Sequence, residues 1–222
     1  MFETQEKVER HALDFSKESA LEARNQAWKV LEKIVQAIRP GMTEEAALSL
    51  ARTTIDEAGF EKHWHKPIVR FGKDTVRGYS ESFSGEILLQ KEDIFFLDIG
   101  PVWKGYEADV GKTFVLGDDQ EKRRCAEDSE MLWKEMRDAW KSRGLNGKAL
   151  YEFGTSQAKE KGWVFKLDAA NGHRLSDFPH HVYYKGNMTN ISWTPAPYLW
   201  MLEVQLVHPT RPFGAFFEDL LF

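Results

Sequence analysis

Two pairs of acidic residues lie within strongly apolar segments, and the first pair is found in the segment FFLDIGPVWKGYEADVGKTFVL. Asp98 and Asp109 stand on either side of a predicted hairpin bend at residues 103–105. If the turn centres between residues 103 and 104, the aspartates lie directly opposite each other, with Cβ atoms about 5 Å apart on one sheet face. Carboxylates that close repel each other unless one is protonated or a cation lies between them. Because aspartate is also a poor strand former, a bound divalent metal ion is the explanation that we favour.

The second pair lies in the C-terminal segment WMLEVQLVHPTRPFGAFFEDLLF, where Pro209 and Pro212 mark the bend. A turn centred between residues 210 and 211 places Glu203 directly opposite Glu218. An edge strand whose acids prevent aggregation would explain one such pair. Two pairs, each aligned by its own turn, are better explained by metal binding.

An imidazole joins the four carboxylates in this interpretation. His173 directly follows Gly172, a residue that allows the backbone to lie close to a neighbouring element. Neutral imidazole is a common ligand of transition metals. The five side chains suffice for two adjacent divalent ions with a bridging water; Mn is favoured, and Zn, Co and Fe stay open. Two ions about 3.5–4 Å apart acidify such a water and polarise a scissile carbonyl.

The spacing of apolar residues predicts the elements that position these side chains. Helical spacing covers residues 5–38, and Thr43 is a good N-cap for a second helix that ends near residue 58. Further expected elements are strands at 66–72, 95–100 and 106–115, helices at 119–142 and 147–161, and strands at 198–207 and 214–221. Helices followed by strands, twice over, indicate an α+β fold with two related halves. We expect one catalytic domain over residues 1–222, onto which the N-terminal helices, about 5–58, pack.

Charge and composition exclude several classes of function. The 222 residues carry a net charge of −5, which gives no bulk attraction to nucleic acid or anionic lipid. No apolar run approaches the roughly 20 residues of a membrane span, and the charged N-terminus does not resemble a signal peptide. Cys125 is the single cysteine, which suits a reducing compartment. We therefore expect a cytoplasmic protein without nucleic-acid or membrane partners, and a homodimer is left open.

The five candidate ligands, in their chain order, resemble those of the pita-bread metallopeptidases: methionine aminopeptidase, aminopeptidase P and prolidase. The family order is Asp, Asp, His, Glu, Glu, with ten residues between the aspartates, as between Asp98 and Asp109. Residues 39–44, RPGMTE, also resemble the family's bend between its first two helices, so the resemblance runs from about residue 20 to the end. It implies curved antiparallel sheets flanked by helices, in two halves related by a pseudo-twofold axis.

The resemblance also implies a role for each ligand. Asp98 would bind one ion, while Asp109 and Glu218 would bridge both ions. His173 and Glu203 would complete the other site. Glu203 would in addition take a proton from the bridging water, and His173 would lie next to the substrate.

A second histidine and three departures from the family bear on the activity. His180 follows His173 by seven residues, the spacing of the aminopeptidase P–prolidase branch, in which this histidine contacts the substrate's peptide group. Residues 77–82, RGYSES, lack the family's loop histidine. His63 and His65 come earlier, and His65 is interpreted as a loop residue, with contact to the substrate as the alternative. The sequence Glu203-Val204-Gln205 replaces the usual Glu-Pro-Gly, and the link between the two glutamates is short. We expect no N-terminal domain of the aminopeptidase P or prolidase type, so the chain would be the catalytic domain alone.

The sequence therefore predicts a dinuclear metal-dependent hydrolase. The preferred activity is that of a metallopeptidase that removes an N-terminal residue or dipeptide from a short peptide. The resemblance, chiefly at His180, implies that a substrate of the Xaa-Pro type is one option. The altered loop favours a first alternative, a hydrolase of a small amide or amidine, similar to creatinase or ectoine hydrolase. A second alternative is a non-catalytic binding module of the same fold, against which the complete set of ligand types argues.

Overall fold

The computed structural model describes residues 4–79, 81, 87–175 and 177–222. Its helices are α1 (Gln5–Val8), α2 (Lys17–Ala37), α3 (Glu44–Glu57), η1 (Gly72–Val76), α4 (Gln120–Arg143), α5 (Gly147–Glu160) and η2 (Met188–Asn190). Its strands are β1 (Lys62–His63), β2 (Ile68–Phe71), β3 (Asp93–Ile99), β4 (Pro101–Trp103), β5 (Tyr106–Glu107), β6 (Val110–Leu116), β7 (Val164–Phe165), β8 (His173–Arg174), β9 (Trp200–Val207) and β10 (Gly214–Leu220).

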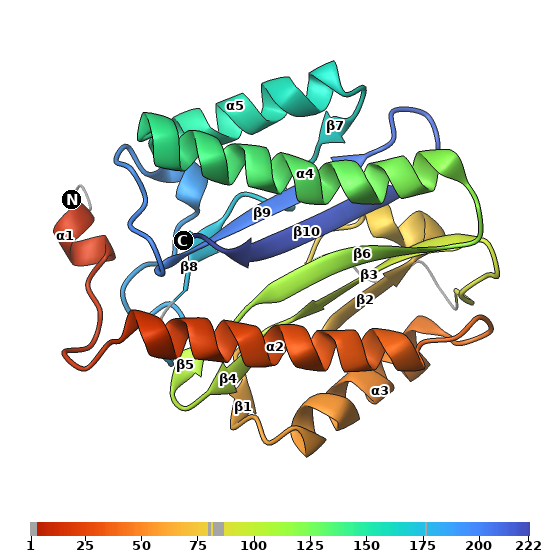
Figure 1. Cartoon of the computed structure of the whole chain (residues 1–222), viewed down its shortest axis with the longest axis horizontal. Coiled ribbons are helices and arrows are strands. Elements are labelled where there is room, and N and C mark those ends of the chain that lie inside the picture. The colour runs from red at the N-terminus through yellow and green to blue at the C-terminus, as the bar shows by residue number, and fades with distance from the viewer. Residues whose placement is uncertain (1–3, 80, 82–86, 176) are drawn as a thin grey trace.

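The large antiparallel sheet joins two halves of similar construction. Its strands follow the order β2-β3-β6-β10-β9-β7, with β8 paired to β9, while β1, β4 and β5 form a smaller sheet. In the first half α2 and α3 precede β2, β3 and β6, and in the second half α4 and α5 precede β7, β9 and β10. The halves meet where β6 pairs with β10, and Figure 1 shows α2 beside the first half and α4 beside the second. The predicted α+β fold with two related halves is confirmed.

The two faces of the sheet differ in character because successive side chains of a strand point to opposite sides. On one face, Leu97 and Ile99 of β3 belong to an apolar core shared with α2 and α3. On the other face, Phe96 packs against Phe216 of β10. Asp98 follows Phe96 by two residues and therefore shares its face. The helix-covered face thus supplies the core, and the opposite face is free to carry polar groups.

The predicted helix over residues 5–38 is wrong in its first part. Residues 9–16 separate α1 from α2, and the hydroxyl of Ser16 caps α2. In this interval the carboxylate of Glu9 accepts a hydrogen bond of 2.9 Å from the indole of the buried Trp200. The local sequence favours a continuous helix, but hydrogen bonds to the second half of the chain hold this segment in another path.

The C-terminal hairpin has the predicted register. Glu203 of β9 stands directly opposite Glu218 of β10, and the bend between the strands covers residues 208–213. Because the strands pair without interruption from Gly214 to Leu220, the turn alone fixes which residues face each other.

The first hairpin is displaced from the predicted register. Asp98 pairs with Gly111, and Asp109 lies two residues before that position. The cause is the turn, which centres on Lys104 and Gly105, both with positive φ angles of 51° and 78°. An even displacement keeps both aspartates on the same face of the sheet, although they are not directly opposed.

Within the described ranges, no helix combines the length and apolar character needed to cross a bilayer.

Candidate metal centre

A cavity of about 460 Å³ opens on the face of the sheet opposite the helices. The five predicted ligands and His180 all line it; they are Asp98, Asp109, His173, His180, Glu203 and Glu218. Ile68, Phe96 and Phe216 form an apolar wall of the same cavity. The structure therefore gathers charged groups from both halves of the sheet next to an apolar surface.

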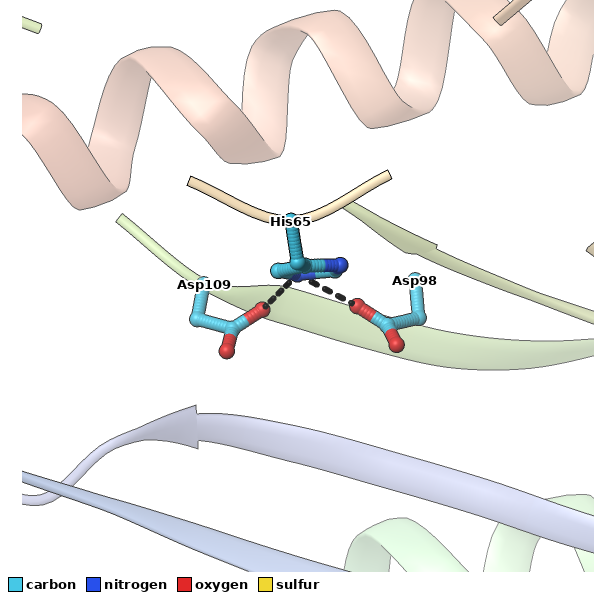
Figure 2. Close-up of side chains that lie close together, drawn as sticks. All are labelled: His65, Asp98 and Asp109. Carbon is cyan, nitrogen blue, oxygen red and sulfur yellow. Dashed lines mark hydrogen bonds and ion pairs between the residues drawn. The ribbon is translucent and has the colours of Figure 1, made fainter. Parts of the chain in front are cut away.

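The donor atoms form two groups that share one residue. His65, Asp98 and Asp109 offer atoms that all lie within 4.8 Å of one another, and so do Asp109, His173 and Glu218. Figure 2 shows the first group, with the imidazole of His65 between the two carboxylates. Because Asp109 belongs to both groups, one carboxylate is common to the two sets of donor atoms.

Asp109 is buried at the centre of the cluster, with a histidine at each carboxylate oxygen. Its Oδ1 lies 3.1 Å from Nε2 of His65, and its Oδ2 lies 3.1 Å from Nε2 of His173. Burial alone would raise the pKa of Asp109, but the charges and hydrogen bonds of the two histidines lower it below its usual value. Asp109 is therefore held as an anion.

Asp98 and Glu218 are buried acids that favour protonation when no cation is near. Burial, with the charge of Asp109, raises the pKa of Asp98 to about 7, although His65 acts in the opposite direction. Burial and the neighbouring carboxylates raise the pKa of Glu218 well above its usual value. Within the part of the chain that the structure describes, Oδ1 of Asp98 and Oε1 of Glu218 have no hydrogen-bond partner. Buried carboxylate oxygens of this kind are costly unless a cation or proton satisfies them.

Glu203 belongs to neither three-residue group, yet it lines the same cavity. Its Oε2 accepts hydrogen bonds from the backbone N–H groups of Gly172, at 2.7 Å, and Asn171, at 3.2 Å. Burial raises the pKa of Glu203, an effect that the positive charge of His173 opposes. The backbone thus fixes one carboxylate oxygen of this buried acid.

His173 is positioned by the close approach that its neighbouring glycine allows. Gly172 has a φ of 68°, and a Cβ there would lie only 2.7 Å from the hydroxyl of Tyr151 and 2.9 Å from the carbonyl of Met201. The Nδ1 of His173 lies 3.2 Å from the carbonyl oxygen of Arg174. Burial would lower the pKa of His173, but Asp109 and Glu203 raise it to about 9. The role of Gly172 predicted from the sequence fits this geometry.

His180 is held at the edge of the cavity by two contacts. Its Nδ1 lies 3.0 Å from Oε2 of the buried Glu107, and its ring stacks on Trp64 with centroids 3.9 Å apart. Burial and the positive charge of His173 lower the pKa of His180 to about 3, so its ring is neutral. The ring centroids of His180 and His173 are 5.4 Å apart, which brings the two histidines to one site.

The sequence interpretation of His65 as an ordinary loop residue is incomplete. The residue does lie outside the strands, between β1 and β2, but it is only 7% exposed and stands between Asp98 and Asp109. Burial would lower its pKa, and the two carboxylates raise it to about 9. Nothing periodic marks this histidine. Its one sequence signal is Gly100, where a side chain would collide with the ring.

The donor set fits divalent metal ions. It is made of carboxylate oxygens and imidazole nitrogens, the ligands that suit Mn, Fe, Co and Zn. Two of its buried oxygens accept no hydrogen bond from the described residues, and one carboxylate is common to both groups. A cation at each group would satisfy these oxygens and replace the protons that several of the groups otherwise hold.

Metal uptake is expected to strengthen as the pH rises from about 6 to about 9. The pKa values of about 7 for Asp98 and about 9 for His65 and His173 mean that the metal-free cluster binds protons over this range. A metal ion must displace them, and each displaced proton raises the apparent affinity about tenfold per pH unit. Calorimetric titration in two buffers of different ionisation enthalpy measures the released protons. An affinity independent of pH, without proton release, would contradict this assignment.

Comparisons with known proteins identify the fold and the family of this chain. The chain has the fold of the pita-bread metallopeptidases, as its similarity to solved structures shows. Residues 18–220 match the metallopeptidase family M24, and the chain belongs to that family.

Three solved structures illustrate the similarity. The X-Pro aminopeptidase from Thermotoga maritima has 19% identity and a TM-score of 0.72, covering 90% of this chain and 56% of its own. The prolidase from Pyrococcus horikoshii has 16% identity and a TM-score of 0.74, covering 91% and 57%. The methionine aminopeptidase from Thermotoga maritima has 15% identity and a TM-score of 0.72, covering 94% and 93%.

One curated relative matches over a shorter stretch. A protein of Mycoplasma pneumoniae, provisionally named a Xaa-Pro aminopeptidase, is 29% identical over 89 residues, which is 40% of this chain and 25% of the relative. This chain thus spans a quarter of that relative, and a little more than half of the X-Pro aminopeptidase and prolidase chains.

Proposed function

We propose that this chain is a dinuclear metal-dependent peptidase that removes an N-terminal residue or dipeptide from short peptides, with a preference for Xaa-Pro sequences. The observation that carries the proposal is the pair of three-residue donor groups that share Asp109 within one cavity. Membership of the metallopeptidase family supports the reaction class. The names of the similar X-Pro aminopeptidase and prolidase support the peptide preference.

The proposed ligands of the two ions are Asp98, Asp109, His173, Glu203 and Glu218. Two ions, Mn²⁺ by preference, would supply a Lewis acid for the scissile carbonyl and lower the pKa of a water at the site. Asp109 reaches both donor groups, and its lowered pKa keeps it available as an anion. Glu203 has the raised pKa of a group that can hold the proton of the attacking water.

Two further features would position a peptide. His180, fixed by Glu107 and Trp64, lies at the cavity edge and would contact the substrate's peptide group. The wall of Ile68, Phe96 and Phe216 provides an apolar surface that suits a proline ring.

A library of short peptides with and without Xaa-Pro at the N-terminus tests the proposal, with Mn²⁺ added or removed by a chelator. We expect metal-dependent release of the N-terminal residue or dipeptide, fastest for the Xaa-Pro members. A protein that binds Mn²⁺ and cuts no member of the library is not a peptidase of this kind.

The segment at residues 77–82 favours a second candidate, a hydrolase of small amides or amidines. This segment has no histidine, and Tyr79 lines the cavity at this point. A small substrate needs fewer contacts with the surrounding loop than a peptide does. Turnover of a cyclic amide or amidine by a protein that leaves peptides intact would select this candidate. A protein without metal uptake would instead be the binding module. The cytoplasmic location and the homodimer stay predictions.

A further inference from the structure

The imidazole of His65 is held in one orientation by contacts with neighbouring residues. Its Nδ1 lies 2.8 Å from the carbonyl oxygen of Lys66, and Trp64 packs on the ring at a centroid distance of 4.3 Å. The ring stands directly over Gly100, where a Cβ would lie 1.9 Å from Cδ2 and 2.2 Å from Nε2. Only glycine at position 100 is compatible with this placement.

The hydrogen bond at Nδ1 determines what His65 presents to the cluster. A backbone carbonyl only accepts, so Nδ1 carries the proton, and a neutral ring directs the lone pair of Nε2 at its other neighbours. These are Oδ1 of Asp109 at 3.1 Å and Oδ1 of Asp98 at 3.4 Å (Figure 2). A cation at this point would be shared by the Nε2 lone pair and the two carboxylate oxygens.

His65 repeats the arrangement of His173. Each histidine has Nδ1 next to the carbonyl oxygen of the following residue, which is the partner that orients many metal-binding histidines. Each also has Nε2 at 3.1 Å from one oxygen of Asp109, His65 at Oδ1 and His173 at Oδ2. The two imidazoles therefore stand in equivalent positions around the shared carboxylate.

We propose that His65 is a sixth metal ligand, which completes the site of the ion bound by Asp98, so that each of the two ions has one imidazole. This inference rests on the proposed dinuclear site and adds a nitrogen ligand to its five side chains. Oδ1 of Asp98 has no hydrogen-bond partner among the described residues and lies 3.4 Å from Nε2 of His65. A metal ion between these two atoms would be a ligand partner for both of them.

A nitrogen ligand at this position changes the preferred metal. Carboxylates and water suit Mn²⁺, whereas imidazole favours Co²⁺, Zn²⁺ and Fe²⁺. The metal site at Asp98 is therefore expected to bind Co²⁺ more tightly than an all-oxygen site would. The substitution His65→Ala should lower the affinity for Co²⁺ more than the affinity for Mn²⁺.

Titration of the chain with Co²⁺, followed by visible absorption and calorimetry, tests the inference. The variants are His65→Ala, Gly100→Ala, which displaces the ring but keeps the imidazole, and the control His63→Ala. His63 is a neighbouring histidine that pairs with Asp56 at 3.2 Å. We expect two Co²⁺ per wild-type and His63→Ala chain, and at least about tenfold weaker binding of one Co²⁺ in the other two variants. Addition of free imidazole should restore tight binding of the second Co²⁺ ion to the His65→Ala variant.

X-ray absorption of the wild-type protein loaded with Co²⁺ provides a readout that needs no variant. We expect an average of one imidazole per cobalt; one imidazole for every two cobalt ions would overturn the inference. Two Co²⁺ bound by His65→Ala with wild-type affinity and spectrum would also overturn it, and would leave the proposed peptidase intact. A wild-type chain that binds no metal would instead refute the proposed function itself.

Discussion

Replacement of Glu203 by glutamine is expected to lower peptide turnover at least about 100-fold while most of the bound metal remains. Glutamine keeps an oxygen that can accept the backbone hydrogen bonds of Gly172 and Asn171. It cannot hold a proton as a carboxylate does, and loss of a positioned general base typically costs 10²–10⁴-fold, about two to four orders of magnitude. Steady-state kinetics with the best peptide of the library, together with metal analysis, measure the effect.

Glu130→Gln is a matched control for this change. Glu130 lies on α4, pairs with Lys112 and Lys134, and is not among the residues that line the candidate cavity. The Glu130→Gln variant should retain wild-type turnover. If Glu203→Gln also retains it, Glu203 is not the proton acceptor.

Replacement of Asp109 by asparagine should remove more metal than any other single change in the cluster. Asp109 takes part in both donor groups, whereas Asp98 takes part in one. We therefore expect Asp109→Asn to bind less than about one ion per chain and to lose activity, because asparagine carries no charge to share between two cations. Asp98→Asn is the comparison, and should keep about one ion. Elemental analysis after dialysis counts the ions; equal stoichiometry in both variants would contradict the bridging role.

The same replacement should alter how the metal-free protein responds to pH. Asp109 helps to raise the pKa of His65 and His173 to about 9, above the usual value of 6.5. Groups whose pKa rises on folding stabilise the fold fully below their unfolded pKa, and this contribution disappears as the pH rises through about 9. Thermal melting of Asp109→Asn should therefore show a larger deficit at pH 6 than at pH 9.

Local signals in the sequence predicted much of the fold and of the candidate site. Thr43 caps α3 through the N–H of Ala46, because capping depends on neighbouring residues only. The prolines at 209 and 212 mark a turn that aligns Glu203 with Glu218. In these cases a few adjacent residues determine the geometry, and the sequence displays them directly.

Features that depend on distant contacts were not predictable in the same way. The turn at Lys104 and Gly105 requires a positive φ at lysine, which nothing in its residue type announces, and the register of the first hairpin moved by two positions as a result. His65 lies 33 and 44 positions before Asp98 and Asp109, so no periodic pattern connects them. Residues 9–16 leave the helix because they bond to residues far along the chain, Glu9 to Trp200, Ala12 to Asp177 and Ser16 to Tyr106.

The pairing of β6 with β10 joins the two halves of the sheet, so metal binding should affect how firmly the halves are held together. Register pairs at this seam are few, Phe217 with Lys112 and Glu218 with Gly111, and the candidate donors come from both sides of it. A metal ion that binds the two halves only when they are docked stabilises the docked arrangement. The free energy needed to separate β6 from β10 therefore increases with the metal concentration. Amide protons of β6 and β10 should therefore exchange with solvent more slowly when the metal is present, even when no substrate is bound.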